Sequence, residues 1–158
     1  MFDLKTLTFV HTAVSLLDLA VGLIVLYGLS EGRRLKPWMG LFIGGAWFTS
    51  LSGFLFPIAG PTPALIVGVV AILVLILVFA AQTKGWRRIF AGGIVVSVYF
   101  QAFVTVAQSF AKIPALKALA PTQTEPPFAI AQLVVLIAFV LAGVVSVKKA
   151  GGGAVAPA

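Results

Sequence analysis

Five long apolar runs divide the chain, and short polar or basic stretches separate them. The runs cover residues 8–29, 38–56, 64–82, 89–110 and 128–147. Each is close to or above the roughly 20 residues that an α-helix needs to cross the hydrocarbon core of a bilayer. We therefore predict an all-α integral membrane bundle of five transmembrane helices over residues 1–149, followed by a flexible C-terminal tail over 150–158.

The basic residues predict how this bundle is oriented. Five spans place the stretches 31–37 and 84–88 on the same side as the C-terminal end of the last helix, and together with Lys148 and Lys149 there these segments carry eight Lys and Arg residues. The opposite side carries three, Lys5, Lys112 and Lys117. Because Lys and Arg accumulate in cytoplasmic loops, we expect the N-terminus outside and the C-terminus in the cytoplasm.

Composition narrows the classes of partner and cofactor. The chain is 61% hydrophobic and 9% charged, with a mean hydropathy of +1.15. A net charge of +7 would also fit nucleic-acid binding, but the basic residues lie beside apolar runs, where they contact anionic lipid. We expect the lipid bilayer as partner and no nucleic acid. With no cysteine and one histidine, the chain offers too few ligands for a metal site, and we expect no cofactor.

Polar side chains inside the runs fall on three of them at helical spacing. The first run contains Thr8, His11, Ser15 and Asp18; the second contains Gly45, Thr49 and Ser52; the fourth contains Ser97, Gln101, Thr105 and Gln108. The runs 64–82 and 128–147 are apolar almost throughout, with Gln132 the main exception. We expect these two helices at the lipid-facing periphery and the other three packed together inside.

Antiparallel packing of the first and fourth helices sets the register of these stripes. Asp18 then lies level with Gln101 and His11 level with Gln108, since each helix separates its two positions by about 10 Å. The inner half of the bundle holds few comparable groups, so the pattern predicts a polar pocket open to the outside. The candidate ligand- or proton-binding residues are Asp18, His11, Ser15, Gln101, Thr105, Gln108, Thr49, Ser52 and Gln132.

Two of these residues have two interpretations each. A carboxylate deep in a membrane costs roughly 2.5–3.5 kcal/mol, so Asp18 is either a protonated group that holds helices in register or a proton or cation site. His11 either forms an interfacial hydrogen bond, to Gln108 or to lipid headgroups, or titrates together with Asp18.

The leading functional expectation is a non-enzymatic membrane protein that binds a small ligand, a lipid-soluble molecule or a proton in this pocket. The alternative is a structural or accessory subunit of a larger complex or a homo-oligomer, in which Gly40 and Gly44 form a small-xxx-small contact between helices. An enzyme is the third alternative, because Glu125 and His11 both lie near the outer surface. No phosphate loop or Ser-His-Asp pattern is present, and we assign no catalytic residue.

The long connection over 111–127 is less generic than the other loops. We expect a short interfacial helical turn over 114–120, and Thr124 or Glu125 as the cap of the last helix. The alternative is a lid over the outer pocket, since loops of this length are often functional.

This region also carries a resemblance to a known group of proteins. The string YFQAFVTVAQSFAKIPALKALAPTQTEPPF over 99–128, ending in the pattern APTQ-x-EPPF, resembles a motif in a family of small bacterial integral membrane proteins. That family has no established activity. The resemblance therefore implies a multi-pass protein of the bacterial inner membrane and transfers no site residues.

Overall fold

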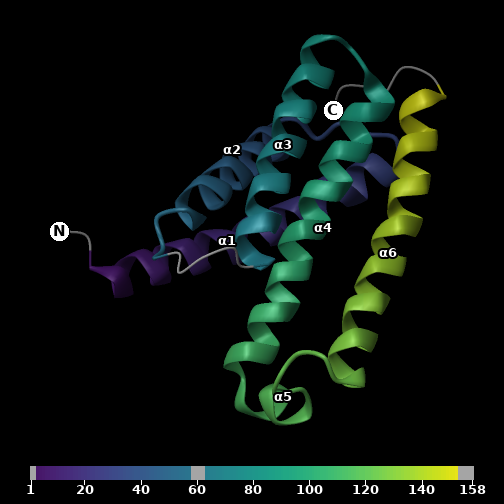
Figure 1. Cartoon of the computed structure of the whole chain (residues 1–158). Coiled ribbons are helices and arrows are strands. Elements are labelled where there is room, and N and C mark those ends of the chain that lie inside the picture. Colours follow the sequence, from purple (N-terminus) through teal and green to yellow (C-terminus); the bar gives the residue numbers. More distant parts are fainter. Residues whose placement is uncertain (1–2, 58–62, 153–158) are drawn as a thin grey trace.

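The computed structural model describes residues 3–57 and 63–152, with the side chains of residues 63 and 64 left out. Six helices make up almost all of this part of the chain, and it contains no β-strand, which confirms the all-α prediction (Figure 1). They are α1 (Leu4–Ser30), α2 (Lys36–Gly53), α3 (Pro63–Thr83), α4 (Arg87–Lys112), α5 (Pro114–Leu119) and α6 (Pro126–Gly151).

Four of these helices are long and apolar enough to cross a membrane. They are α1, α4, α6 and the stretch of α3 from Leu65 to Thr83. The protein is therefore a multi-pass membrane protein by helix length and composition. The remaining long helix, α2, has 18 residues, about 27 Å of helix, and its glycine and hydroxyl residues lower its hydropathy. The fifth span and the orientation of the termini stay predictions.

The helices form two groups that cross each other. In Figure 1, α3, α4 and α6 lie roughly side by side with α4 in the middle, and α4 has its most extensive contacts with α6 and α3. The α1–α2 hairpin runs across this group at a steep angle, and α1 contacts both α4 and α6. The antiparallel bundle of near-parallel helices that the sequence predicts is thus replaced, for α1 and α2, by an oblique crossing.

Glycine allows the close approach of the two groups. A Cβ atom on Gly22 of α1 would lie 2.8 Å from the Phe42 ring of α2 and 3.0 Å from Val98 of α4. Phe42 and Val98 are both fully buried in the main core, so neither can yield to a larger side chain. Gly22 therefore marks the point where α1, α2 and α4 meet.

The predicted contact through Gly40 and Gly44 is not made within the described chain. Nothing lies within 4 Å of a Cβ atom built at either position. The buried residues of α2 are Met39, Phe42, Ala46 and Ser52, and the two glycines lie off that face. Both glycines are therefore open on the outside of α2.

The predicted division into inner and peripheral helices is right for α3, α4 and α6. None of the apolar stretch of α6 and 17% of that of α3 is buried, against 39% for α4. The value for α1 is only 22%, although we expected it inside the bundle. Because α1 crosses α4 obliquely, its first turns extend beyond α4 and stay exposed (Figure 1).

The connection between α4 and α6 is held by its own contacts. The predicted short helix is confirmed as α5, which packs mainly against α4, so it does not lie as a lid over α1. Gln123, in the left-handed region with φ 60°, donates from Nε2 to the carbonyl of Ala107 at 2.8 Å. The rings of Phe110 and Phe128 meet edge to face with centroids 5.4 Å apart.

Two sequence predictions fall largely outside the described residues. The turn between α2 and α3 includes residues 58–62, and the predicted tail includes 153–158. Residues 150 and 151, which we assigned to the tail, belong to α6, and Ala150 is buried.

Candidate functional site

Asp18 lies where three helices meet. Its side chain is 4% exposed, and the Nε2 group of Gln101 donates a hydrogen bond to its Oδ2 atom across the α1–α4 crossing. The third wall is Gly45 of α2, where a Cβ atom would overlap the Asp18 carboxyl group. The prediction that Asp18 lies level with Gln101 is confirmed. Gly45 is the member of this site that we did not assign from the sequence, although it lies on the same stripe as Thr49 and Ser52.

The amide of Gln101 is only half satisfied. Its Nε2 group is bonded to Asp18, whereas its Oε1 atom is buried and has no hydrogen-bond partner in the described part of the chain. A buried carbonyl oxygen without a donor costs about 1–3 kcal/mol relative to a satisfied one. The site therefore has an acceptor that one additional proton donor would satisfy.

His11 forms a second pair at the open end of the α1–α2 hairpin, away from the loop that joins the two helices. Its Nδ1 atom lies 2.8 Å from the Oγ atom of Ser52, which is 6% exposed, and its ring meets Phe56 edge to face at 5.2 Å. The predicted level of His11 with Gln108 is wrong, because Gln108 is exposed and His11 bonds to α2 instead.

The remaining candidates do not converge on Asp18. The hydroxyl groups of Ser15, Thr49 and Thr105 donate to carbonyl groups of their own helices, at 2.7, 3.1 and 2.8 Å. Gln132 of α6 donates from Nε2 to the Phe103 carbonyl of α4 at 3.1 Å. The predicted residues thus form two separate pairs, Asp18–Gln101 and His11–Ser52, and several hydrogen bonds to helix backbones. The prediction that they line one shared pocket is wrong.

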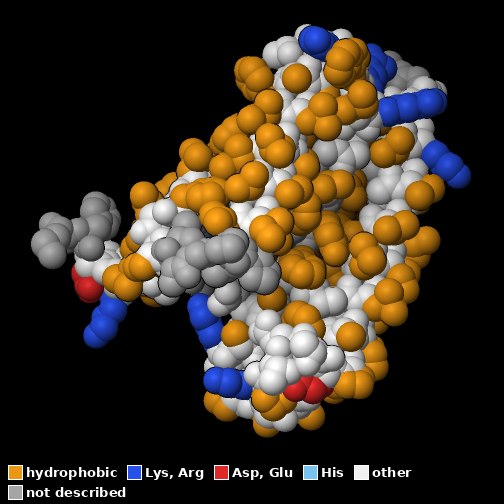
Figure 2. Space-filling view, in the orientation of Figure 1, with side chains coloured by type: hydrophobic (Ala, Val, Ile, Leu, Met, Phe, Trp, Pro, Cys, Tyr) orange, Lys and Arg blue, Asp and Glu red, His pale blue; other side chains and the backbone are white. Residues whose placement is uncertain are grey.

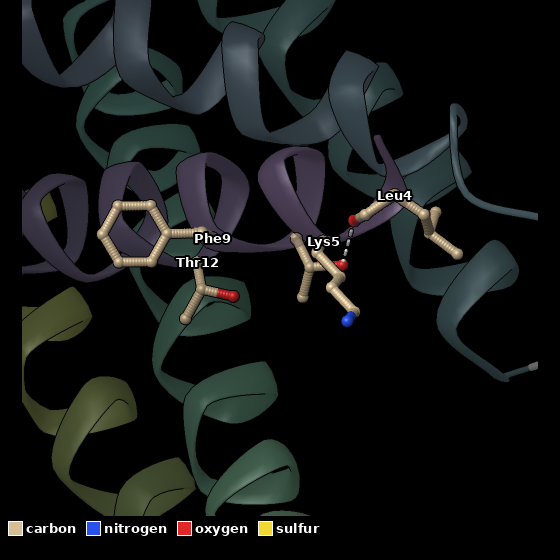
Figure 3. A pocket seen from close by; sticks show the side chains of 5 residues that line it. Leu4, Lys5, Phe9 and Thr12 are labelled. Atoms are coloured by element: carbon tan, nitrogen blue, oxygen red, sulfur yellow. Dashed lines mark hydrogen bonds between the residues drawn. The ribbon is translucent and has the colours of Figure 1, made fainter. Parts of the chain in front are cut away.

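An open groove does lie on α1, but away from Asp18. Figure 3 shows it near the start of the helix, lined by Leu4, Lys5, Thr8, Phe9 and Thr12. All five residues come from one helix, so the groove has no opposite wall of its own. Thr12 and Asp18 are six residues apart, about 9 Å along the helix. We assign the groove no part in the Asp18 site.

The Glu125 carboxylate is hydrogen-bonded to residues of its own loop. Its carboxylate accepts hydrogen bonds from the Thr122 backbone N–H at 3.2 Å, the Thr122 hydroxyl at 2.8 Å and the Thr124 backbone N–H at 3.1 Å. Glu125 occupies the N-cap position of α6, but its side chain makes no cap hydrogen bond. The first residues of α6 are Pro126 and Pro127, which have no N–H to donate. The expected capping bond is therefore replaced by bonds to the preceding turn, which explain Glu125 without catalysis.

These bonds also lower the pKa of Glu125. Desolvation raises the pKa of its carboxyl group, but the hydrogen bonds from Thr122 and Thr124 outweigh this effect and hold the pKa below its usual value.

Among the described residues, no group of three His, Cys, Asp or Glu side chains could hold a metal ion.

Because Asp18 and Gln101 are hydrogen-bonded, we expect their substitutions to be energetically coupled, whereas substitutions of His11 and Gln108 should be independent. In a double-mutant cycle of Asp18→Ala and Gln101→Ala, we expect about 1 kcal/mol of coupling in the free energy of unfolding in detergent, the size typical of hydrogen bonds between membrane helices. The matched cycle of His11→Ala and Gln108→Ala should show none. Coupling in the second cycle alone would contradict the described crossing.

Acidification should release the loop that Glu125 holds. Because the pKa of folded Glu125 is lowered, its contribution is present above the usual value of 4.5 and is lost as the pH falls through the folded pKa. We expect the Thr122 and Thr124 amide resonances to titrate together with a midpoint below 4.5, as measured by NMR. Glu125→Gln should abolish the titration, and a midpoint at or above the usual value would contradict the bonding described.

The chain matches no known protein family, no curated protein and no solved structure. The resemblance of residues 99–128 to a bacterial membrane family stays a prediction. The geometry of the described helices is therefore the basis for assigning a function.

Proposed function

We propose that this multi-pass membrane protein is non-enzymatic and binds a proton at the Asp18–Gln101 pair. The observation that carries the proposal is the unpaired Oε1 atom of Gln101 beside a buried carboxyl group. A proton on Asp18 can donate to Oε1 while Oδ2 still accepts from Nε2. The acid and the amide then form two parallel hydrogen bonds, and no buried charge remains.

The close packing favours a proton over the larger ligands that the sequence left open. Asp18 is 4% exposed, and its carboxyl group fills the space that a side chain at position 45 would need. A small molecule at this point would have to separate α1 from α2. A proton needs only a change in the hydrogen bonds.

A polar path to Asp18 follows the α1–α2 seam. His11 and Ser15 precede Asp18 on α1 at intervals of about one helical turn, and Ser52 of α2 is bonded to His11. Proton transfer through membrane helices uses such series of His, hydroxyl and carboxyl groups. The path leads from the outer end of the hairpin to the crossing with α4.

Protonation of Asp18 would change how tightly α1 is held against α4. The neutral pair has one hydrogen bond more than the ionised pair and leaves no acceptor unsatisfied. Since α1 touches α4 over a short length only, this single level dominates the contact between the two helices. Binding of the proton is thus coupled to the packing of the α1–α2 hairpin.

Infrared difference spectroscopy across the pH range of the folded protein tests this proposal. We expect a carboxylic C=O band that Asp18→Asn abolishes and that Gln101→Met shifts, because the band reports a hydrogen-bonded acid. The background is small, since the chain has four Asp and Glu residues. The control Asp3→Asn, at the exposed start of α1, should leave the band in place. A spectrum without any band dependent on Asp18 would overturn the proposal.

A second candidate is an accessory subunit of a larger membrane complex, and the exposed Gly40 and Gly44 favour it. A partner helix could approach α2 closely there, since nothing in the described chain lies within 4 Å. Co-purification of a partner or a second copy in mild detergent, lost in Gly44→Leu and retained in Asp18→Asn, would support this role. An unaltered monomer in both variants would exclude it.

We also propose five spans in a bacterial inner membrane, with the N-terminus outside. The near-antiparallel course of α2 along α1 and the basic ends of the helices support this topology. The chain has no cysteine, so single-cysteine variants report cleanly. A membrane-impermeant maleimide should label Ala118→Cys in intact cells and Thr83→Cys only after permeabilisation. The reverse pattern would refute the orientation.

A further inference from the structure

Three basic segments that are far apart in the sequence meet at one end of the bundle. They are the α1–α2 loop, the α3–α4 turn and the end of α6. Arg34 of the loop lies over Phe90 of α4, and Lys149 of α6 lies 3.8 Å from a Cβ position on Gly32. Lys and Arg side chains gather at the top and upper right of Figure 2, beyond the apolar surface.

Arg34 is the most constrained of these cations. Its guanidinium carbon lies 4.5 Å from the centre of the Phe90 ring, and Phe90 is 2% exposed. The guanidinium group is half-buried, yet none of its five N–H donors has a hydrogen-bond acceptor among the described residues. Burial, and then the charge of Arg87, lower the pKa of Arg34, so positive charge is concentrated at this end.

Arg88 and Lys149 complete a group of three cations around the end of α6. The Arg88 guanidinium packs directly against Gly151, where a Cβ atom would overlap it. Arg34, Arg88 and Lys149 form no ion pair with a described carboxylate. The nearby helix α4 begins at Arg87, and its N-cap residue Trp86 makes no side-chain cap hydrogen bond, so the N-terminal end of the helix adds positive potential.

Exposed aromatic side chains show that this end lies at the level of lipid headgroups. Trp86 and Trp38 are 45% and 43% exposed, and Lys84 lies over the Trp86 ring with its Nζ atom 4.8 Å from the centre. Tryptophan beside Lys and Arg is typical of the interface between hydrocarbon and water. The phosphate groups of the adjoining leaflet occupy the same level.

We propose that Arg34, Arg88 and Lys149 bind the phosphate of an anionic phospholipid. A guanidinium group donates two parallel hydrogen bonds to phosphate oxygens, which supplies the acceptors that Arg34 and Arg88 lack. Lys149, whose side chain lies beside Gly32 of the α1–α2 loop, adds a third cation. The lipid thereby links the α1–α2 loop to α4 and α6 at their basic end.

A membrane lipid fits this position better than a soluble phosphate compound. The cations lie next to helices whose apolar surfaces face outward, so a bound headgroup can keep its acyl chains against exposed residues such as Val144 and Ile89. A soluble anion would gain only the electrostatic part of this binding. The test must therefore separate the two sources of phosphate.

Native mass spectrometry in a mild non-ionic detergent, with phosphatidylglycerol added, measures the binding. We expect wild-type protein to retain phosphatidylglycerol in preference to phosphatidylcholine. The double variant Arg34→Gln/Arg88→Gln should weaken retention about tenfold or more, since each basic residue near the surface contributes to lipid attraction. Arg88→Gln/Lys149→Gln leaves Arg34 on Phe90 and should show a similar loss with the fold intact by circular dichroism.

The matched control is Lys112→Gln/Lys117→Gln, which removes the same charge at the opposite end of the bundle. We expect this control to bind phosphatidylglycerol as wild type does. Equal losses in control and site variants would mean attraction by net charge alone and would overturn the proposal. Displacement of the lipid by inorganic phosphate at equal concentration would overturn it as well, because a soluble anion would then be the ligand.

Discussion

A helix that crosses a neighbouring helix obliquely approaches it closely only near the crossing point. The packing of α1 against α4 therefore depends on the few residues of α1 that lie at this point. Gly22 lets Phe42 and Val98 reach the α1 backbone, and Gly45 leaves room for the Asp18 carboxyl group. Gln101 of α4 then bonds to that carboxyl group. The two glycines thus let α1 and α2 pack closely, and the Gly22–Val98 contact and the Asp18–Gln101 pair join α1 to α4, beside the contacts of α2 with α3 and of α1 with α6. The described remainder of α1 is free to follow α2 outward, which is why the His11–Ser52 pair lies apart.

The sequence was sufficient for the helices and for one of the two expected contacts across α1 and α4. Apolar length and proline positions predict the helices to within a few residues, because bilayer length and backbone hydrogen bonding leave few alternatives. The Asp18–Gln101 pair followed from helical spacing and antiparallel order. The same reasoning failed for His11 and Gln108, since spacing along each helix contains no information about the crossing angle. It failed for Gly40 and Gly44 because small residues allow a close approach without specifying which helix makes it.

The candidate site contains fewer polar side chains than the polar stripes in the sequence predict. The hydroxyl groups of Ser15, Thr49 and Thr105 donate hydrogen bonds to carbonyl groups one turn away on their own helices. Residue type alone does not distinguish such a bond from a contact with a ligand. What remains is the Asp18–Gln101 pair, in which the Gln101 Oε1 atom has no partner; among the described residues Gln132 Oε1 and Ser146 Oγ are buried and unsatisfied as well. An unsatisfied acceptor is expensive in a medium without water. The proton that we propose for the Asp18 site would satisfy the Gln101 acceptor without needing additional space.

The distance in sequence between Asp18 and Gln101 has a consequence for biogenesis. The two residues are 83 positions apart, so α1 cannot form this contact until α4 has been synthesised. By contrast, α4 and α6 are joined through the connection that contains α5, whose bonds are local, and they can pair as soon as both emerge. Until α4 is synthesised, α1 can pair with α2, the helix with which it has its most extensive contacts, but its carboxyl group lacks the amide partner. Docking of the α1–α2 hairpin onto α4 is therefore a later step than formation of the hairpin.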